Sequence, residues 1–196
     1  MIYNERTQRH EQVVASARQM LTAVRTAPKA RGVDIIEAIL VEGADLKLLA
    51  ERMVEIGNNR NRPSFIRDAG NVLQAECIVA IGTRYQSLGL NCGHCGFATC
   101  AERENSKFST LNFIAKGSKT FGSQFQVPCS LNSIDVGIAV GSACATAADL
   151  RLDTRVMYSI GVAVKQLGWI GEGVHLTMGI AVSASSKNPF FDRPTK

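Results

Sequence analysis

The 196-residue chain has few aromatic side chains and no long apolar run. Phe, Trp and Tyr make up 6% of the residues, with one Trp, so the stacking platforms that bind single-stranded nucleic acid are scarce. No stretch of about 18 consecutive apolar residues marks a membrane span. Residues 1–10 are polar and charged, unlike a signal peptide. We therefore expect a cytoplasmic protein that binds neither nucleic acid nor membrane.

The sequence also lacks a recognisable catalytic set. It contains three histidines, and no Ser–His–Asp order or nucleophile with a partnering base stands out. The formal net charge of +5 is mild and scattered, which is compatible with an anionic cofactor or partner but equally with solvated surface charge. Hydrophobic residues at 45% and charged residues at 20% are ordinary for a globular protein, so we predict a single domain over residues 1–196.

Three of the six cysteines fall within residues 91–100, in the spacing Cys-x2-Cys-x4-Cys. Cys92 and Cys95 are each followed by glycine, which tolerates positive φ and lets backbone N–H groups approach a central object. Iron–sulfur clusters are bound by thiolates whose sulfurs also accept N–H hydrogen bonds. The stretch therefore predicts a [4Fe–4S] site with Cys92, Cys95 and Cys100 as three ligands. Thiolate ligands also suit a reducing, cytoplasmic location.

Other chemistries fit this stretch less well. A zinc knuckle would have His in place of Cys100 and Cys in place of Asn105, and a zinc ribbon would need a second Cys-x2-Cys pair. A thioredoxin-type dithiol has no use for a third cysteine. His94, between two ligands, is interpreted as a solvated loop residue. A structural zinc site and a dithiol or disulfide remain open as alternatives.

The fourth cluster ligand must come from Cys77, Cys129 or Cys144. Cys77 lies in an apolar strand pattern and Cys144 in an apolar helix pattern, so both are interpreted as small core residues. Cys129 follows Pro128 in a non-helical stretch, from which a thiolate can be aimed without distorting an element. The 28 residues between Cys100 and Cys129 allow almost any geometry at a modest entropic cost. We predict Cys129 as the fourth ligand.

Apolar periodicity predicts a mixed fold. Pro63 is favoured in the first turn of a helix, and the strand that begins at Cys77 is apolar without alternation, as in strands covered on both faces. Ser133 and Asp153 are predicted N-caps. We expect an α+β domain in which helices cover a small sheet. The predicted helices are 4–27, 45–56, 64–74, 133–150 and 154–167, the strands 35–41, 77–81 and 174–182, the cluster-binding segment 91–129, with one helical turn at 101–104 and mostly loop over 105–127.

The two late predicted helices are unusually apolar. Gly137 and Gly141 share a stripe of the helix over 133–150 with two alanines, although each internal glycine costs about 1 kcal/mol against alanine. Such a helix needs the close approach of another backbone or a ligand, and tight core packing is the alternative explanation. Because both helices carry so little charge, we predict a homodimer with the two helices central and partly at the interface.

The motifs together resemble the uncharacterised prokaryotic family described as proteins containing a ferredoxin domain. The resemblance covers nearly the whole chain and implies a four-iron cluster rather than a particular reaction. It also agrees with Cys129 as a ligand, because the Pro-Cys pair lies just ahead of the family's Asp-x-Gly-Ile-Ala motif. The similar segments are 25–34, the cysteine loop, 135–143, 153–158 and 183–193.

A fainter resemblance links the chain to flavin-dependent nitroreductases, through the first helix with Arg-Thr-Ala-Pro-Lys, the following strand, residues 42–50 and the late helix pair that ends at 166–168. It implies a nitroreductase-like fold and an interlocked homodimer with FMN at the subunit interface. The basic residues that it places near the flavin phosphate are Arg25, Lys29 and Arg31, with Lys187 and Arg193 as further candidates. Lys29 departs from the small polar residue usual after the proline, and solvated surface charge is the alternative for each cation.

Three functions follow from these patterns. The first is a redox enzyme in which a [4Fe–4S] cluster exchanges electrons with FMN to reduce a small substrate. The second is a ferredoxin-like electron carrier or partner subunit without flavin, which the missing catalytic set favours. The third is a structural cluster or zinc site that staples a long loop. The substrate and the redox partner protein are not identified by the sequence.

Overall fold

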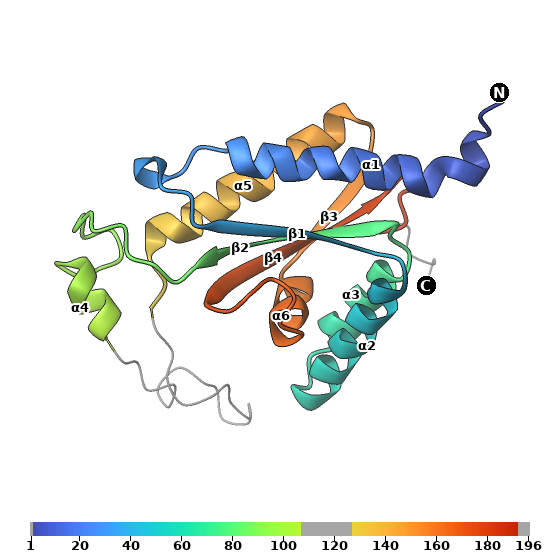
Figure 1. The fold of residues 1–196 in the computed structure, drawn as a ribbon. Coiled ribbons are helices and arrows are strands. Elements are labelled where there is room, and N and C mark those ends of the chain that lie inside the picture. The colour runs from blue at the N-terminus through green and yellow to red at the C-terminus, as the bar shows by residue number, and fades with distance from the viewer. Residues whose placement is uncertain (1, 107–126, 192–196) are drawn as a thin grey trace.

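A computed structural model describes residues 2–106 and 127–191 of the chain. Within these residues, four strands form one antiparallel sheet in the order β1-β2-β4-β3 (Figure 1). The predicted α+β class is confirmed. The strands are β1 (Ile36–Glu42), β2 (Cys77–Arg84), β3 (Asp153–Met157) and β4 (Val174–Ser183).

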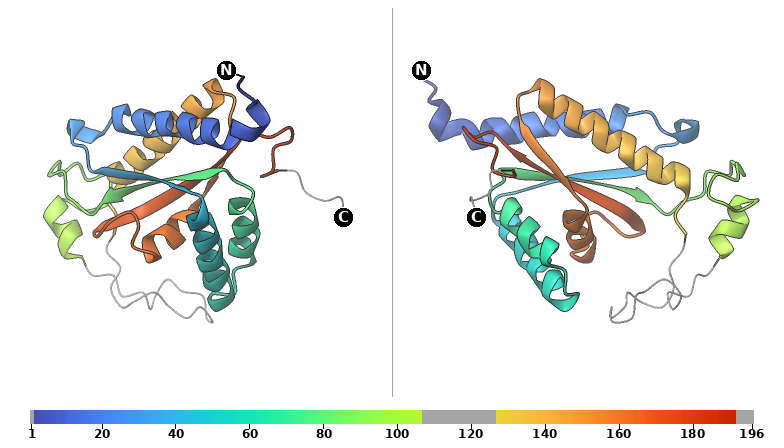
Figure 2. Two further views of the ribbon diagram at one scale, coloured as in Figure 1. Left: turned by 45° about the vertical axis from the view of Figure 1, so that its right-hand side comes forward. Right: turned by 180° about the vertical axis from the view of Figure 1, so that it is seen from behind.

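Helices cover both faces of the sheet (Figures 1 and 2). On β2, Cys77, Val79 and Ile81 face one apolar core, and Ile78 and Ala80 face the other. This double burial explains why β2 is apolar without alternation. Helices α1 (Glu5–Thr26) and α5 (Ser130–Asp149) cover the first face, helices α2 (Ala44–Asn59), α3 (Pro63–Val72) and α6 (Tyr158–Gln166) cover the second, and α4 (Cys100–Asn105) and the short 3-10 helix η1 (Ala30–Gly32) lie in connections.

The ends of the early helices lie close to the predicted positions, because capping residues and prolines determine them. Asn4 is the N-cap of α1, where its side-chain oxygen accepts a hydrogen bond from the Arg6 N–H at 3.1 Å. The helix ends at Thr26, just before Pro28, and Pro63 lies in the first turn of α3. These boundaries agree with the sequence pattern because each depends on neighbouring residues alone.

The predicted helix over 154–167 is wrong in its first part. Thr154 and Val156 are extended in β3 and pair with Val182 and Ile180 of β4, and only the later residues form α6. Asp153 is therefore a strand residue and not an N-cap. Pairing along a sheet edge depends on residues that are distant in the sequence, so composition did not show it.

Helix α5 begins three residues earlier than predicted. Cys129 is its N-cap, and Ser133 lies inside the first turn, where its hydroxyl donates to the Cys129 carbonyl at 3.0 Å. The prediction of Ser133 as N-cap is wrong. Helix α4 likewise continues to Asn105, so the predicted loop begins one residue later, and residues 107–126 of that loop lie outside the described residues.

The glycine stripe of α5 faces away from the protomer. Gly137 and Gly141 are exposed, and a Cβ atom built on either would meet nothing within 4 Å. Core packing within one chain therefore does not explain them. In the part of the chain that the structure describes, α5 is also the one helix whose length and hydropathy suit a membrane span, a test that core helices of water-soluble proteins also pass.

Candidate metal centre

The cysteine loop after β2 is folded onto itself. The Cys100 N–H donates to Asn91 Oδ1 at 2.8 Å, and the Asn91 N–H donates to Cys100 Sγ at 3.4 Å. Between these ends, the Gly96 N–H donates to the Gly93 carbonyl at 2.9 Å. Gly93 and Gly96 have φ values of 70° and 87°, which other residues rarely adopt. The glycines therefore serve the turn that the sequence motif indicates.

The structure brings the four predicted ligands to one pocket. Cys92, Cys95 and Cys100 line it from the loop, and Cys129 lines it from the N-terminus of α5. A hydrogen bond at 3.4 Å from the Ser130 hydroxyl to a carbonyl of the loop joins the two sides. The carbonyl that accepts this hydrogen bond belongs to His94. Among the described residues that line the pocket, Cys77 and Cys144 do not occur.

The donor set does not match a site formed for a single ion. Among the residues described, no three His, Cys, Asp or Glu side chains are gathered closely enough to hold one metal ion. The ligands of a four-iron cluster bind different irons, so their sulfurs lie farther apart than those around one zinc ion, where each Zn–S bond is about 2.3 Å. Four thiols around one pocket are a ligand set that both a four-iron cluster and a zinc ion use, and the choice of the cluster rests on the ferredoxin motif.

The pocket also contains a buried cation that the sequence analysis missed. Arg103 of α4 lines the pocket and is 1% exposed. Its guanidinium donates to the Val127 carbonyl at 3.1 Å and to Glu104 Oε1 at 3.3 Å, while Nε has no hydrogen-bond partner in the described structure. Burying a cation is costly unless negative charge lies nearby. Glu104 supplies one such charge at 3.3 Å, and a cluster bound by thiolates would add more, so the pocket is compatible with an anionic group.

The surroundings of three cysteines shift their pKa values in opposite directions. A hydrogen bond with the Ser87 hydroxyl is the main cause that lowers the pKa of Cys100, and a hydrogen bond from the Asn91 N–H lowers it further. Burial raises the pKa of Cys77 to about 12, and burial also raises the pKa of Cys144. Because metal binding requires the thiolate, these shifts favour Cys100 as a ligand and support the interpretation of the other two as core residues.

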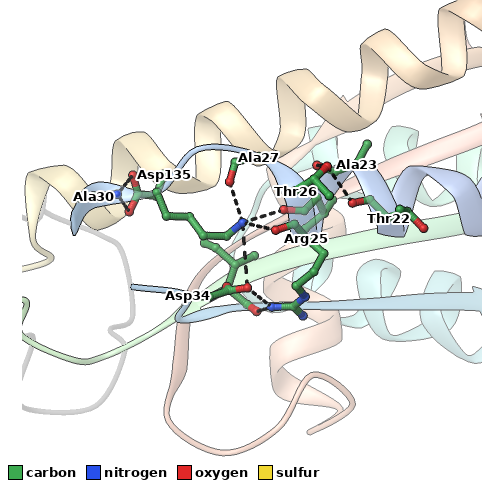
Figure 3. A network of polar contacts seen from close by, with 11 residues as sticks. Thr22, Ala23, Arg25, Thr26, Ala27, Ala30, Asp34 and Asp135 are labelled. Atoms are coloured by element: carbon green, nitrogen blue, oxygen red, sulfur yellow. Dashed lines mark hydrogen bonds and ion pairs between the residues drawn. The ribbon is translucent and has the colours of Figure 1, made fainter. Parts of the chain in front are cut away.

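Lys29, one of the predicted phosphate ligands, is occupied within the protomer. Its ammonium group donates to the carbonyls of Val24, Arg25 and Ala27 at 3.0, 2.7 and 2.8 Å, so it caps the C-terminus of α1 (Figure 3). Its side chain is 5% exposed, and Asp34 lies 4.0 Å away. All three ammonium protons therefore have carbonyl acceptors in the described structure.

The neighbouring arginines have protein partners as well. Arg25 donates to Asp34 at 2.5 Å, and Arg31 donates to the Leu88 carbonyl at 2.6 Å, which ties the basic loop to the start of the cysteine loop. The buried Asp135 of α5 accepts the Ala30 N–H on both oxygens at 3.1 Å (Figure 3). Two carboxylates thus lie beside the three cations and reduce the local positive charge.

One protomer does not bring all five predicted basic residues together. Residues 25–34 precede Ile36, which pairs with Thr83 at the end of the sheet where the cysteine loop begins. Lys187 follows Ser183 at the opposite end of the sheet. Arg193 lies outside the described residues. The role of these five residues at a phosphate stays a prediction.

Comparisons with known proteins place the chain in a family. A family described as "Uncharacterized protein containing a ferredoxin domain" matches residues 126–193, a segment that includes Cys129. A protein of Archaeoglobus fulgidus described as uncharacterized is 38% identical over 197 residues, covering 100% of both chains. The chain belongs to this ferredoxin-domain family. The family resemblance seen in the sequence is confirmed, and the ferredoxin domain implies an iron–sulfur cluster.

Solved structures confirm the nitroreductase-like fold. A nitroreductase with bound FMN from Desulfitobacterium hafniense superposes with a TM-score of 0.53 at 13% identity, covering 88% of this chain and 78% of that one. A putative nitroreductase from Bacillus subtilis gives a TM-score of 0.53 at 16% identity, covering 93% and 82%. At these sequence identities the similarity establishes the fold of this ferredoxin-domain protein. It does not identify the cofactor, which has to be inferred from the residues of the site.

Proposed function

We propose that this ferredoxin-domain protein binds a [4Fe–4S] cluster through Cys92, Cys95, Cys100 and Cys129 and transfers electrons. The observation that carries the proposal is the pocket, which collects these four thiols from segments separated by 28 residues, while Cys77 lies in the apolar core and Cys144 packs against it. One-electron transfer is the chemistry that such a cluster supplies.

Residues of this chain would bind the cluster, balance its negative charge and leave one edge of it accessible. The Asn91 N–H already donates to a ligand sulfur, and Arg103 places a buried cation at the pocket. Leu88 and Phe97 form an apolar wall that limits the access of water. Cys92 is exposed, which leaves one edge of the pocket open to a redox partner protein.

Anaerobic purification with iron and sulfide analysis tests the proposal. We expect about four iron atoms per chain and a broad absorbance band at about 400 nm. Cys129→Ser should lose the cluster or convert it to a three-iron form visible by EPR, whereas Cys77→Ser and Cys144→Ser should retain four irons. A colourless protein with stoichiometric zinc, or a Cys129→Ser protein that keeps its full cluster while Cys144→Ser loses it, would contradict the assignment.

A second candidate is flavin-dependent reduction of a small substrate, with the cluster and FMN exchanging electrons. The fold and the position of the basic loop beside the cysteine loop favour it. Because Lys187 lies at the far end of the sheet from Arg25 and Arg31, a phosphate that contacts both sets requires two protomers. The exposed small-residue face of α5, with Gly137 and Gly141, suits the second copy.

FMN titration of the cluster-loaded protein separates an enzyme from a carrier. Quenching of flavin fluorescence at about one FMN per chain, weakened by Arg31→Ala, would support the flavin site. Arg52→Ala on α2, a half-buried arginine that pairs with Glu55 within its own helix, is the matched control. If the loaded protein leaves FMN fluorescence unchanged, the flavin-free electron carrier is the function that remains.

A further inference from the structure

A row of polar side chains leads from the cysteine pocket into the sheet. The Arg103 guanidinium carbon, which belongs to the pocket lining, lies 4.9 Å from the centre of the Tyr85 ring. On its other side, the Tyr85 ring meets the His175 ring edge-on, with 5.0 Å between ring centres. Tyr85 follows β2 and His175 lies near the start of β4, so the row joins the pocket to the adjacent end of the sheet.

Several polar atoms of this row are buried without hydrogen bonds, although the Arg103 guanidinium has other partners at Val127 and Glu104. The Tyr85 hydroxyl, both His175 ring nitrogens and Arg103 Nε have no partner in the described part of the chain. Leaving a buried polar atom unpaired is unfavourable, so packing alone does not favour these side chains, of which Tyr85 and His175 are half-buried. A native protein that keeps three such residues in contact has another use for them.

The backbone around His175 is also irregular. The pairing of β2 with β4 shifts register between Ile81 and Thr83, opposite His175 and Met178. Leu176 has a φ of 45°, which is strained for a leucine. Such bulges redirect a side chain that a regular strand would point elsewhere. We infer that the strained backbone at Leu176 and the register shift together set the position of the His175 ring.

A surface groove begins next to His175 in the sequence, because Leu176 is one of its lining residues. The groove runs between α6 and β4, and Lys165, Leu176 and Tyr158 are among its lining residues. Lys165, at its mouth, is exposed and acts electrostatically on His175. The groove therefore reaches the residue that follows His175 in β4.

The charged groups around His175 set its protonation. Burial lowers the pKa of His175 below 6.5, and the cations Lys165 and Arg103 lower it further, while the Thr83 carbonyl opposes them as an acceptor for the protonated ring. Tyr85, another titratable neighbour, keeps its proton at neutral pH because burial raises its pKa. The ring is therefore neutral at pH 7, and added negative charge in the pocket would favour the imidazolium.

We propose that His175 takes up one proton from water in the α6–β4 groove when one electron enters the cysteine pocket, so that the protein stores an electron and a proton together. The inference rests on the proposed cluster. The electron comes from a one-electron donor, the proton binds an imidazole nitrogen, no other bond forms or breaks, and both leave on reoxidation. Tyr85 holds the ring in place and separates it from the Arg103 cation.

Redox titration of the anaerobically loaded protein with dithionite, followed by EPR at several pH values, tests the coupling. The potential should fall by about 59 mV for each tenfold drop in proton concentration over a range above the oxidised-state pKa of His175. His175→Gln, which cannot be protonated, should flatten this dependence. His10→Gln, which removes an exposed histidine of α1, should leave it unchanged, and so should Tyr85→Phe.

If His175→Gln does not fold, a substitution at the protein surface provides a second test. Lys165→Gln removes an exposed cation that lowers the pKa of His175, so the pH at which the slope begins should rise. A loaded protein whose potential does not change with pH overturns the inference and leaves the proposed function standing. A slope that persists in His175→Gln, or vanishes in Tyr85→Phe alone, overturns it too. A protein without a cluster would instead refute the proposed function.

Discussion

Replacing Gly141 by leucine should have opposite effects on the isolated protomer and on a dimer. Gly141 lies on the exposed face of α5, and a Cβ atom there meets nothing within 4 Å. An internal glycine costs a helix about 0.8–1.0 kcal/mol relative to alanine, and leucine is nearly as favourable as alanine. In a monomer, Gly141→Leu should therefore raise the free energy of unfolding by about 0.5–1 kcal/mol.

If a second copy packs on this face, the leucine has no room. Overpacking costs about 1–3 kcal/mol, which corresponds to a rise in the dimer dissociation constant of about 5- to 150-fold. Both copies carry the substitution, so the upper part of the range is expected where the two α5 helices face each other. The combination of a more stable protomer with a weaker dimer distinguishes an interface from an ordinary exposed helix face.

Sedimentation at several protein concentrations measures the dissociation constant, and urea unfolding well below that concentration measures the protomer. Gly70→Leu is the matched control, because Gly70 is an exposed glycine inside α3 and its Cβ position is also open. It should stabilise the protomer and leave the dimer unchanged. A monomeric wild-type protein at micromolar concentration, or a Gly141→Leu dimer as tight as the wild type, would refute the reasoning. Recovery of the wild-type chain with lipid vesicles would assign the face to a membrane.

Three further predictions concern stability and can be measured by urea unfolding of the metal-free protein. Lys29→Met removes three hydrogen bonds from a buried ammonium to the last carbonyls of α1, and should lower the free energy of unfolding by about 1–3 kcal/mol; an unchanged value would show that the cap is dispensable. Gly161→Ala places a Cβ atom 1.8 Å from the Thr177 carbonyl oxygen, so it should cost about 1–3 kcal/mol or more, in contrast to a gain for Gly70→Ala. Because burial lowers the pKa of His175 in the folded protein, the unfolded chain binds that proton more tightly, and stability should be full above pH 6.5 and fall as the pH drops below it. His175→Gln should reduce that fall, and an identical pH profile would contradict the assignment.

The parts of the fold that the sequence predicted depend on neighbouring residues. Asn4 as N-cap, Pro63 in a first turn and the tight glycine loop around Cys95 are all specified within a few residues. Cys129 was predicted from the same kind of argument, because a residue after a proline and before a helix is free to aim its side chain. Its place as the N-cap of α5 supplies that freedom.

The parts that the sequence did not predict depend on distant residues. The start of β3 was taken for helix because its partner, the end of β4, lies almost 30 residues later. Arg103 was overlooked because nothing near it in the sequence shows that it is buried, and its contacts with Tyr85 and Val127 exist only in the folded chain. The same holds for His175, whose unpaired nitrogens are visible only once β2 and β4 are joined.

The strand order has a consequence for how the centre is assembled. The cysteine loop follows β2, and Cys129 begins α5, which packs on β2 and β4 together. β2 is held between β1 and β4, and β4 is the last strand among the described residues. Part of the surface that holds α5, and with it the fourth thiol, is therefore made late in the sequence by residues 174–183. We expect a chain cut before β4 to keep every cysteine and yet to hold α5 less firmly, so that loading with iron would report that synthesis and folding are complete.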